Sequence, residues 1–190
     1  MTNIALFASG SGTNVENITK YFSENKEINV VHLFCNKQNA FVLERAKNLQ
    51  LPYTVFNRDE FYNSNDIINK LNTLDVDYIV LAGFLWLIPQ NLIHEFPNKI
   101  INVHPALLPN YGGKGMYGMN VHNAVIKNNE KESGITVHFV NEKYDDGNII
   151  AQKKCSIDIN DNPNDLAEKI HKLEQNFFPS IIEDLINNNI

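Results

Sequence analysis

Short apolar runs alternate along the chain with segments in which apolar residues recur every three or four positions. The runs are nearly continuous, as in strands buried on both faces of a parallel sheet. They occupy residues 4–8, 30–35, 78–81 and 100–103. Helical spacing marks the segments between them, at residues 15–22, 41–49 and 67–71. Because alternating strands and helices imply right-handed crossovers, the pattern predicts an α/β fold with a Rossmann-like, mainly parallel sheet and helices on both faces.

The last third of the chain has a different pattern. Residues 136–140 and 149–157 are typical of strands, and the turn-rich residues 141–148 between them predict a late antiparallel strand. A long closing helix is expected from Asn162 or Pro163, because asparagine can cap a helix and proline fits its first turn. Residues 110–120, NYGGKGMYGMN, contain four glycines. They predict a loop, either a plain surface loop or a lid that orders over a ligand.

Composition limits the possible functions. The 190 residues are 43% apolar and show no internal repeat or linker, so one domain over residues 1–190 is expected. The net charge of −6 argues against a nucleic-acid partner and favours small ligands. Cys35 and Cys155 lie in apolar segments and are expected to be buried free thiols. Without a leader-like or membrane-spanning run, we predict a soluble, cytoplasmic protein, monomeric or homodimeric, with no membrane partner.

Ligands of open parallel sheets bind at the carboxyl ends of the strands. The segment SGSGTN, residues 9–14, follows the first strand and opens a helix, so its backbone N–H groups can hold a phosphate. It lacks the lysine of a P-loop, and Val15 stands where a dinucleotide fingerprint has its third glycine. The alternative is a tight turn in which Thr13 or Asn14 caps the helix.

Asn102 and His104 flank Val103 at the end of another predicted strand. The two-residue period of a strand puts both side chains on one face, where they can converge on one atom. An asparagine amide can hold a developing oxyanion, and a histidine can transfer a proton near neutral pH. The alternative for His104 is a purely structural role.

The segment YDDG, residues 144–147, brings acids to the edge of a later strand. A carboxylate close to His104 would stabilise its imidazolium form; the alternative is an ordinary Asp-Gly turn. The six histidines show no zinc-like spacing and no serine stands in a nucleophile elbow, so no metal and no covalent intermediate are expected. The combination suits direct transfer of an acyl-like group onto a phosphorylated acceptor.

Four segments together closely resemble the folate-dependent formyltransferase family, in particular its branch that formylates glycinamide ribonucleotide. They are SGSGTN at 9–14, LAGF at 81–84, NVHPALLPNY at 102–111 and SGITVHFVNEKYDDGNIIAQ at 133–152. The resemblance runs through nearly the whole chain. It implies the formyltransferase fold and transfer of a formyl group from the co-substrate 10-formyltetrahydrofolate, without a metal, to the amine of glycinamide ribonucleotide in purine (IMP) biosynthesis.

The resemblance also implies roles for single residues. Asn102, His104 and Asp145 fall on the catalytic trio, with Asp145 preferred to Asp146 because the family pattern of acid, any residue, glycine is set by Gly147. The residues that match the family's ribonucleotide-binding positions are Gly12, Thr13, Asn14 and Glu174. Those that match its folate-binding positions are Arg58, Leu85, Trp86, Leu87, Ile88, Asn102, Asn141 and Asp145. The half at about 1–100 would hold the phosphate, and the half at about 101–190 would carry the catalytic and folate side. Trp86 is either a wall of the pterin pocket or a core aromatic.

Other hypotheses are a formyl-group enzyme with a different acceptor and a non-catalytic binding protein. A methionyl-tRNA formyltransferase would need a further C-terminal domain and a hydrolase an N-terminal regulatory domain, and we expect neither in this chain. A sugar-nucleotide formyltransferase stays open, since its catalytic core is similar. A non-catalytic folate or nucleotide binder is disfavoured, because a binder needs no proton donor such as His104.

Overall fold

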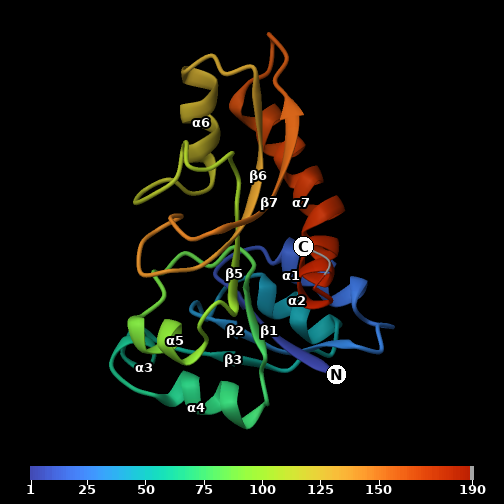
Figure 1. Ribbon diagram of the computed structural model, residues 1–190, viewed down its shortest axis with the longest axis vertical. Helices are drawn as coiled ribbons and strands as arrows, with labels where there is room; N and C mark the ends of the chain where they lie inside the picture. The colour runs from blue at the N-terminus through green and yellow to red at the C-terminus, as the bar shows by residue number, and fades with distance from the viewer. Residues whose placement is uncertain (189–190) are drawn as a thin grey trace. The chain divides into compact units, whose positions relative to one another are not determined.

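The computed structural model describes residues 1–188 of the chain and contains one seven-stranded mixed sheet (Figure 1). The strand order is β3-β2-β1-β4-β5-β6-β7. The strands are β1 Thr2–Ala8, β2 Ile28–Cys35, β3 Tyr53–Val55, β4 Tyr78–Leu81, β5 Ile100–His104, β6 Glu132–Phe139 and β7 Ile149–Ser156. β1 pairs in parallel with β2 and β4, β2 pairs in parallel with β3, and β7 runs antiparallel to β6. The predicted parallel sheet with a late antiparallel strand is confirmed.

Seven helices accompany the strands in the described residues. They are α1 Thr13–Tyr21, α2 Val42–Asn48, α3 Arg58–Tyr62, α4 Asp66–Thr73, α5 Gln90–Glu95, α6 Met119–Lys127 and α7 Pro163–Ile186. The chain forms two compact units, Met1–Ile101 (unit 1) and Asn102–Ile190 (unit 2). No helix among residues 1–188 is both long and apolar enough to cross a membrane.

The core of unit 1 explains why its strands show unbroken apolar runs. Every residue from Ile4 to Ala8 in β1 is fully buried, so both faces of this strand are covered. The Phe7 ring stacks on Phe34 of β2 with 4.8 Å between centroids and meets Phe84 edge-on at 5.5 Å. The strands of unit 1 are therefore held by aromatic packing on top of their hydrogen-bond ladder.

Unit 2 is built on the β6–β7 pair and the closing helix. Asn162 caps α7 through a capping box with Asp165, and Pro163 occupies the first turn, as predicted. Residues spaced by three or four positions bury one face of α7, including Leu166, Ile170 and Phe178. This face packs on β6 and β7, and Figure 1 shows α7 running alongside both strands.

Three expectations need correction. The N-cap of α1 is Gly12, in the left-handed conformation with φ 79°, and no side chain caps this helix, so neither Thr13 nor Asn14 is the cap. The predicted loop 110–120 ends earlier, because Met119 and Asn120 already belong to α6. Both cysteines are free, but only Cys35 is buried, since Cys155 lies on β7 with its side chain half-exposed.

Candidate active site

The end of β5 carries the first two candidate residues. The alternation of the strand places Asn102 and His104 on the same face, one residue either side of Val103. His104 is 3% exposed, whereas Asn102 is half-buried. The strand ends at His104, where Pro105 follows and can donate no further ladder hydrogen bond.

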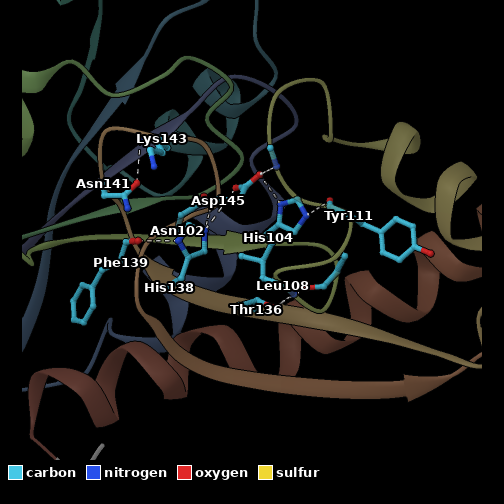
Figure 2. Close-up of polar contacts among 12 residues, drawn as sticks. Asn102, His104, Leu108, Tyr111, Thr136, His138, Phe139, Asn141, Lys143 and Asp145 are labelled. Carbon is cyan, nitrogen blue, oxygen red and sulfur yellow. Dashed lines mark hydrogen bonds and ion pairs between the residues drawn. The ribbon is translucent and has the colours of Figure 1, made fainter.

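The turn between β6 and β7 brings Asp145 to the histidine. Asp145 Oδ2 lies 3.4 Å from His104 Nδ1 and accepts a 2.9 Å hydrogen bond from the Gly113 N–H. Asp146, by contrast, is 56% exposed and faces Lys143 Nζ at 3.7 Å. A Cβ at Gly147 would overlap the Phe139 carbonyl, which explains why the turn needs glycine there. Figure 2 shows the Asp145 carboxylate pointing at the His104 ring.

The charge state of Asp145 follows from these contacts. Burial by itself would raise the pKa of Asp145, but the hydrogen bond and positive charge of His104 and the Gly113 N–H outweigh it. The net effect holds the pKa of Asp145 below its usual value, so the carboxylate is ionised near neutral pH.

Both ring nitrogens of His104 face acceptors. Nδ1 faces the carboxylate, and Nε2 donates a 2.7 Å hydrogen bond to the Tyr111 carbonyl oxygen (Figure 2). Because a ring nitrogen must carry a proton to satisfy an acceptor, the doubly protonated imidazolium fits this setting. Tyr111 itself has φ 59°, and its hydroxyl donates a 2.6 Å hydrogen bond to Glu130. The start of the glycine-rich loop is thus tied to the catalytic histidine candidate.

A second histidine, His138 on β6, belongs to the same cluster. Its Nδ1 donates to the Phe139 carbonyl at 2.8 Å, which leaves Nε2 to accept from Asn102 Nδ2 at 3.1 Å. Burial lowers the pKa of His138, although Phe139 and Asp145 act against this, so the ring is neutral. His138 Nε2 also lies 3.7 Å from Asp145 Oδ1. One carboxylate therefore adjoins two histidines, whose ring nitrogens have different hydrogen-bond partners.

Sequence reasoning considered His138 only as a possible metal ligand and missed its contact with Asn102. A usable signal existed, because Thr136 and His138 alternate as polar residues with the apolar Ile135, Val137 and Phe139 in the second half of β6, which neighbours β5 in the sheet. Thr136 is also structural: its hydroxyl donates to the Ala106 carbonyl at 2.7 Å and accepts from the Leu108 N–H at 3.0 Å. These bonds hold the segment that follows His104.

Unit 1 presents a different kind of site at the end of β1. Gly12 fits its position because an added Cβ would overlap the side chain of Val42 and lie 2.9 Å from the Val42 Cα. With no side chain capping α1, the N–H groups of its first turn, which includes Thr13 and Asn14, can serve an anion. A pocket of about 650 Å³ adjoins the turn, lined by Ser9, Gly10 and residues 37–41.

Two further candidates of unit 1, Arg58 and Trp86, lie in one aromatic cluster. A capping box between Asn57 and Glu60 starts α3 and places Arg58 in its first turn. The Arg58 guanidinium lies 5.0 Å from the Tyr62 ring centroid and 5.6 Å from that of Trp86. The half-buried Trp86 packs against the core ring of Phe61 at 5.8 Å.

Arg58, Trp86 and Leu87 are brought together, since the Tyr62 hydroxyl donates to the Leu87 carbonyl at 2.8 Å. Leu85 is 44% exposed, while Ile88 is only 3% exposed and lies in the core. Leu85 is therefore the one of these two whose side chain can meet a ligand in this arrangement.

Two candidates of unit 2 lie outside the His104 cluster. Glu174 on α7 has its carboxylate 3.8 Å from His171 Nδ1. Asn141 stabilises the β6–β7 turn by accepting from the Lys143 N–H at 3.0 Å, and its amide donates to Asp146 at 3.4 Å. Within residues 1–188, no group of three His, Cys, Asp or Glu side chains could hold a metal ion.

Comparison with known proteins gives one consistent result. A family model described as formyl transferase matches residues 2–182. A phosphoribosylglycinamide formyltransferase of Bacillus subtilis is 39% identical over 194 residues, covering 100% of this chain and 97% of that protein. The chloroplastic phosphoribosylglycinamide formyltransferase of Arabidopsis thaliana is 38% identical over 193 residues, covering 96% of this chain. The match spans 66% of that plant protein, just under two thirds.

A solved structure agrees with these relatives. The crystal structure of phosphoribosylglycinamide formyltransferase from Bacillus halodurans superposes with a TM-score of 0.88 at 31% identity. The match covers 100% of this chain and 97% of that one. The similarity is therefore one of whole fold as well as of local motifs.

Proposed function

Since the chain belongs to the formyl transferase family, we propose that it carries out the reaction named in its relatives, phosphoribosylglycinamide formylation. In this reaction the formyl group of 10-formyltetrahydrofolate moves to the amine of glycinamide ribonucleotide in purine biosynthesis. The observation that carries the proposal is the placement of His104 between the ionised Asp145 and the Tyr111 carbonyl, with the Asn102 amide on the same strand face.

The proposed chemistry uses three side chains. The acceptor amine attacks the formyl carbon, and the formyl oxygen becomes an oxyanion held by the Asn102 amide and protonated His104. His104 then supplies the proton that the departing folate nitrogen needs. Asp145, with its carboxylate 3.4 Å from His104 Nδ1, serves as the counterion of the imidazolium during this step.

The geometry adds a requirement to this mechanism. Nε2 of His104 is engaged by the Tyr111 carbonyl, so donation from this nitrogen to a substrate requires that hydrogen bond to exchange. Tyr111 opens the glycine-rich loop, where Gly113 and Gly115 have positive φ. We therefore propose that this loop, residues 110–118, is a lid that moves when substrates bind.

Binding roles are assigned from both units. Gly12, Thr13 and Asn14 would hold the ribonucleotide phosphate, supported by the uncapped first turn of α1. Glu174 would contact the glycinamide end. Arg58, residues 85–88, Asn102, Asn141 and Asp145 would contact folate. Among the described residues Arg58 has no carboxylate at ion-pair distance and stacks on aromatic rings, which suits an anionic aromatic ligand.

The remaining proposals concern setting and partners. Two free cysteines suit a reducing compartment, so we propose a cytoplasmic location. The net charge of −6 supports small-molecule partners over nucleic acid.

The direct test is formyl transfer from 10-formyltetrahydrofolate to glycinamide ribonucleotide by the purified protein, with an acceptor-free control. We expect tetrahydrofolate release that depends on the acceptor. In a His104→Ala variant this release should fall about a hundredfold or more, because one oxyanion donor and the proton source are lost together.

Other outcomes discriminate between the alternatives. Folate release without acceptor would indicate a hydrolase. Release only with a sugar nucleotide would indicate a sugar-nucleotide formyltransferase. Ligand binding without any release would indicate a binding module, and near-normal activity of His104→Ala would refute the role of that residue.

A further inference from the structure

His122 on α6 is a buried titratable group that the mechanism above leaves unused. Its side chain is 6% exposed, and Nδ1 is enclosed without a hydrogen-bond partner within residues 1–188. Nε2 is not enclosed in this way. A buried polar atom without a partner destabilises the folded state, and most such atoms in proteins are paired. The position therefore calls for an explanation other than stability.

The surroundings of His122 connect two parts of the proposed site. Helix α6 packs against α7, which carries Glu174. His122 interacts electrostatically with both Glu174 and His104. Burial lowers the pKa of His122; Glu174 opposes this and His104 adds to it, with a net lowering. The ring is thus a neutral imidazole near the proposed amine-binding carboxylate and the proposed proton donor.

The other two histidines of the region are less suited to accept a proton. Both nitrogens of His138 are engaged, one by the Phe139 carbonyl and the other by the Asn102 amide. His171 is 47% exposed, and the Glu174 carboxylate 3.8 Å from its Nδ1 raises its pKa, which favours the charged form. With a proton on the enclosed Nδ1, His122 keeps the lone pair of Nε2 available.

We propose that His122 is the base that accepts the proton lost by the acceptor amine during formyl transfer. The inference rests on the proposed function and assigns a residue to a step that Asn102, His104 and Asp145 leave open.

The step balances as follows. Attack forms a bond between the amine nitrogen and the formyl carbon, and the carbonyl electron pair moves to the oxygen. His122 Nε2 takes one proton from the now cationic nitrogen. The oxyanion electron pair re-forms the carbonyl, the bond from carbon to the folate nitrogen breaks, and that nitrogen takes a proton from His104. His122 releases its proton to water and His104 recovers one, so no net proton remains on the protein.

The test compares His122→Gln with the unmodified protein and with His94→Gln, a control that removes an exposed histidine on α5 of unit 1. We expect kcat of His122→Gln to fall about a hundredfold or more, the usual range for a lost general base. The KM for glycinamide ribonucleotide should stay within threefold, and the thermal unfolding midpoint should not fall, because an unpaired buried atom is removed. Added imidazole should restore part of the activity of His122→Ala.

Two kinetic results would overturn the inference: a kcat of His122→Gln within threefold of the unmodified value, or a loss confined to KM. A measurement on the unmodified protein avoids any folding defect of the variants. In ¹⁵N-labelled protein, His122 should be neutral at pH 7 and its signals should shift when glycinamide ribonucleotide is added. A doubly protonated His122, or one that the ribonucleotide leaves unchanged, would refute it.

The same experiment distinguishes an error in this inference from an error in the proposed function. If the proposed function is wrong, the unmodified protein shows no acceptor-dependent transfer. If only the role of His122 is wrong, the unmodified protein shows acceptor-dependent transfer and His122→Gln keeps a similar kcat.

Discussion

Each unit buries a histidine on a central strand of the sheet, but the two histidines are surrounded very differently. His104 in unit 2 is 3% exposed and lies between a carboxylate and a carbonyl oxygen. His32 on β2 of unit 1 is 5% exposed, and its Nε2 meets only the neutral hydroxyl of Thr54 at 2.8 Å. Its Nδ1 is enclosed without a partner among residues 1–188. Burial, with a smaller contribution from Lys70, lowers the pKa of His32 to about 4.

The difference shows that burial alone does not decide what a histidine does. Without a nearby carboxylate, burial keeps His32 neutral at physiological pH, so it lacks the second ring proton that a proton donor would give up. His104, by contrast, has an acceptor beside each ring nitrogen, Asp145 and the Tyr111 carbonyl. Unit 1 otherwise offers ligands a backbone turn and aromatic rings. This difference supports the proposal that unit 2 carries the proton chemistry, while the phosphate and part of the folate contacts are proposed for unit 1.

The strongest test of the comparison makes His104 resemble His32. Asp145→Asn removes the carboxylate charge while keeping the size of the side chain. We expect kcat/KM to fall about a thousandfold, or roughly 4 kcal/mol in activation free energy, because the protonated imidazole loses its counterion. Steady-state formyl transfer, with glycinamide ribonucleotide varied at saturating 10-formyltetrahydrofolate, measures this change in kcat/KM.

Asp146→Asn is the matched control, since this neighbour is 56% exposed and pairs with Lys143. It should keep activity within about threefold. Equal losses in the two variants would mean that the turn as a whole matters, rather than the carboxylate that faces His104.

The second test concerns His32 and acid stability. Its folded pKa lies below its ordinary value of 6.5, so the unfolded chain binds the proton more readily. The contribution of His32 to the unfolding free energy is therefore fully present above about pH 6.5, and it is lost as the pH falls toward 4. The drop from 6.5 to about 4 corresponds to on the order of 3 kcal/mol of unfolding free energy.

Urea unfolding of the unmodified protein and of His32→Gln at pH 7, 5.5 and 4 measures this effect. The variant should lose less stability on acidification, with activity at pH 7 kept. His171→Gln provides a control of opposite sign: the folded pKa of His171 is raised, so its contribution is present below pH 6.5 and lost as the pH rises. Parallel pH profiles for His32→Gln and the unmodified protein would contradict the assignment.

The smallest expected effect concerns the turn of unit 1. Gly12→Ala combines a φ of 79° with a Cβ that overlaps Val42. We expect a loss of about 2 kcal/mol in unfolding free energy and a higher KM for the ribonucleotide, with less effect on kcat. Gly10→Ala serves as the steric control, because its Cβ meets nothing within 4 Å. A stability loss at Gly10 as large as that at Gly12 would show that the overlap with Val42 is not the cause.

Short elements were beyond prediction. β3 has three residues and α3 has five, too few for a periodic signal, although the Asn57–Glu60 capping box was present in the sequence. The nine-residue helix α6, Met119–Lys127, was not predicted either, because the glycines before it hide its start. In each case tertiary packing stabilises an element that local propensity alone does not specify.

The sequence by itself determined the central strands, the late antiparallel pair and the capped start of α7, because continuous apolar runs and cap residues act locally. It also determined that Asn102 and His104 share a face, and the glycine at 147 singled out Asp145 through the resemblance to the family.

Only the tertiary structure decided what surrounds these side chains. The contact of Asn102 with His138 joins residues 36 positions apart, and the Tyr111 carbonyl reaches His104 through a backbone turn with positive φ. Hydrogen bonds and pKa values depend on which atoms lie within a few ångströms, and that proximity arises only when the strands pair.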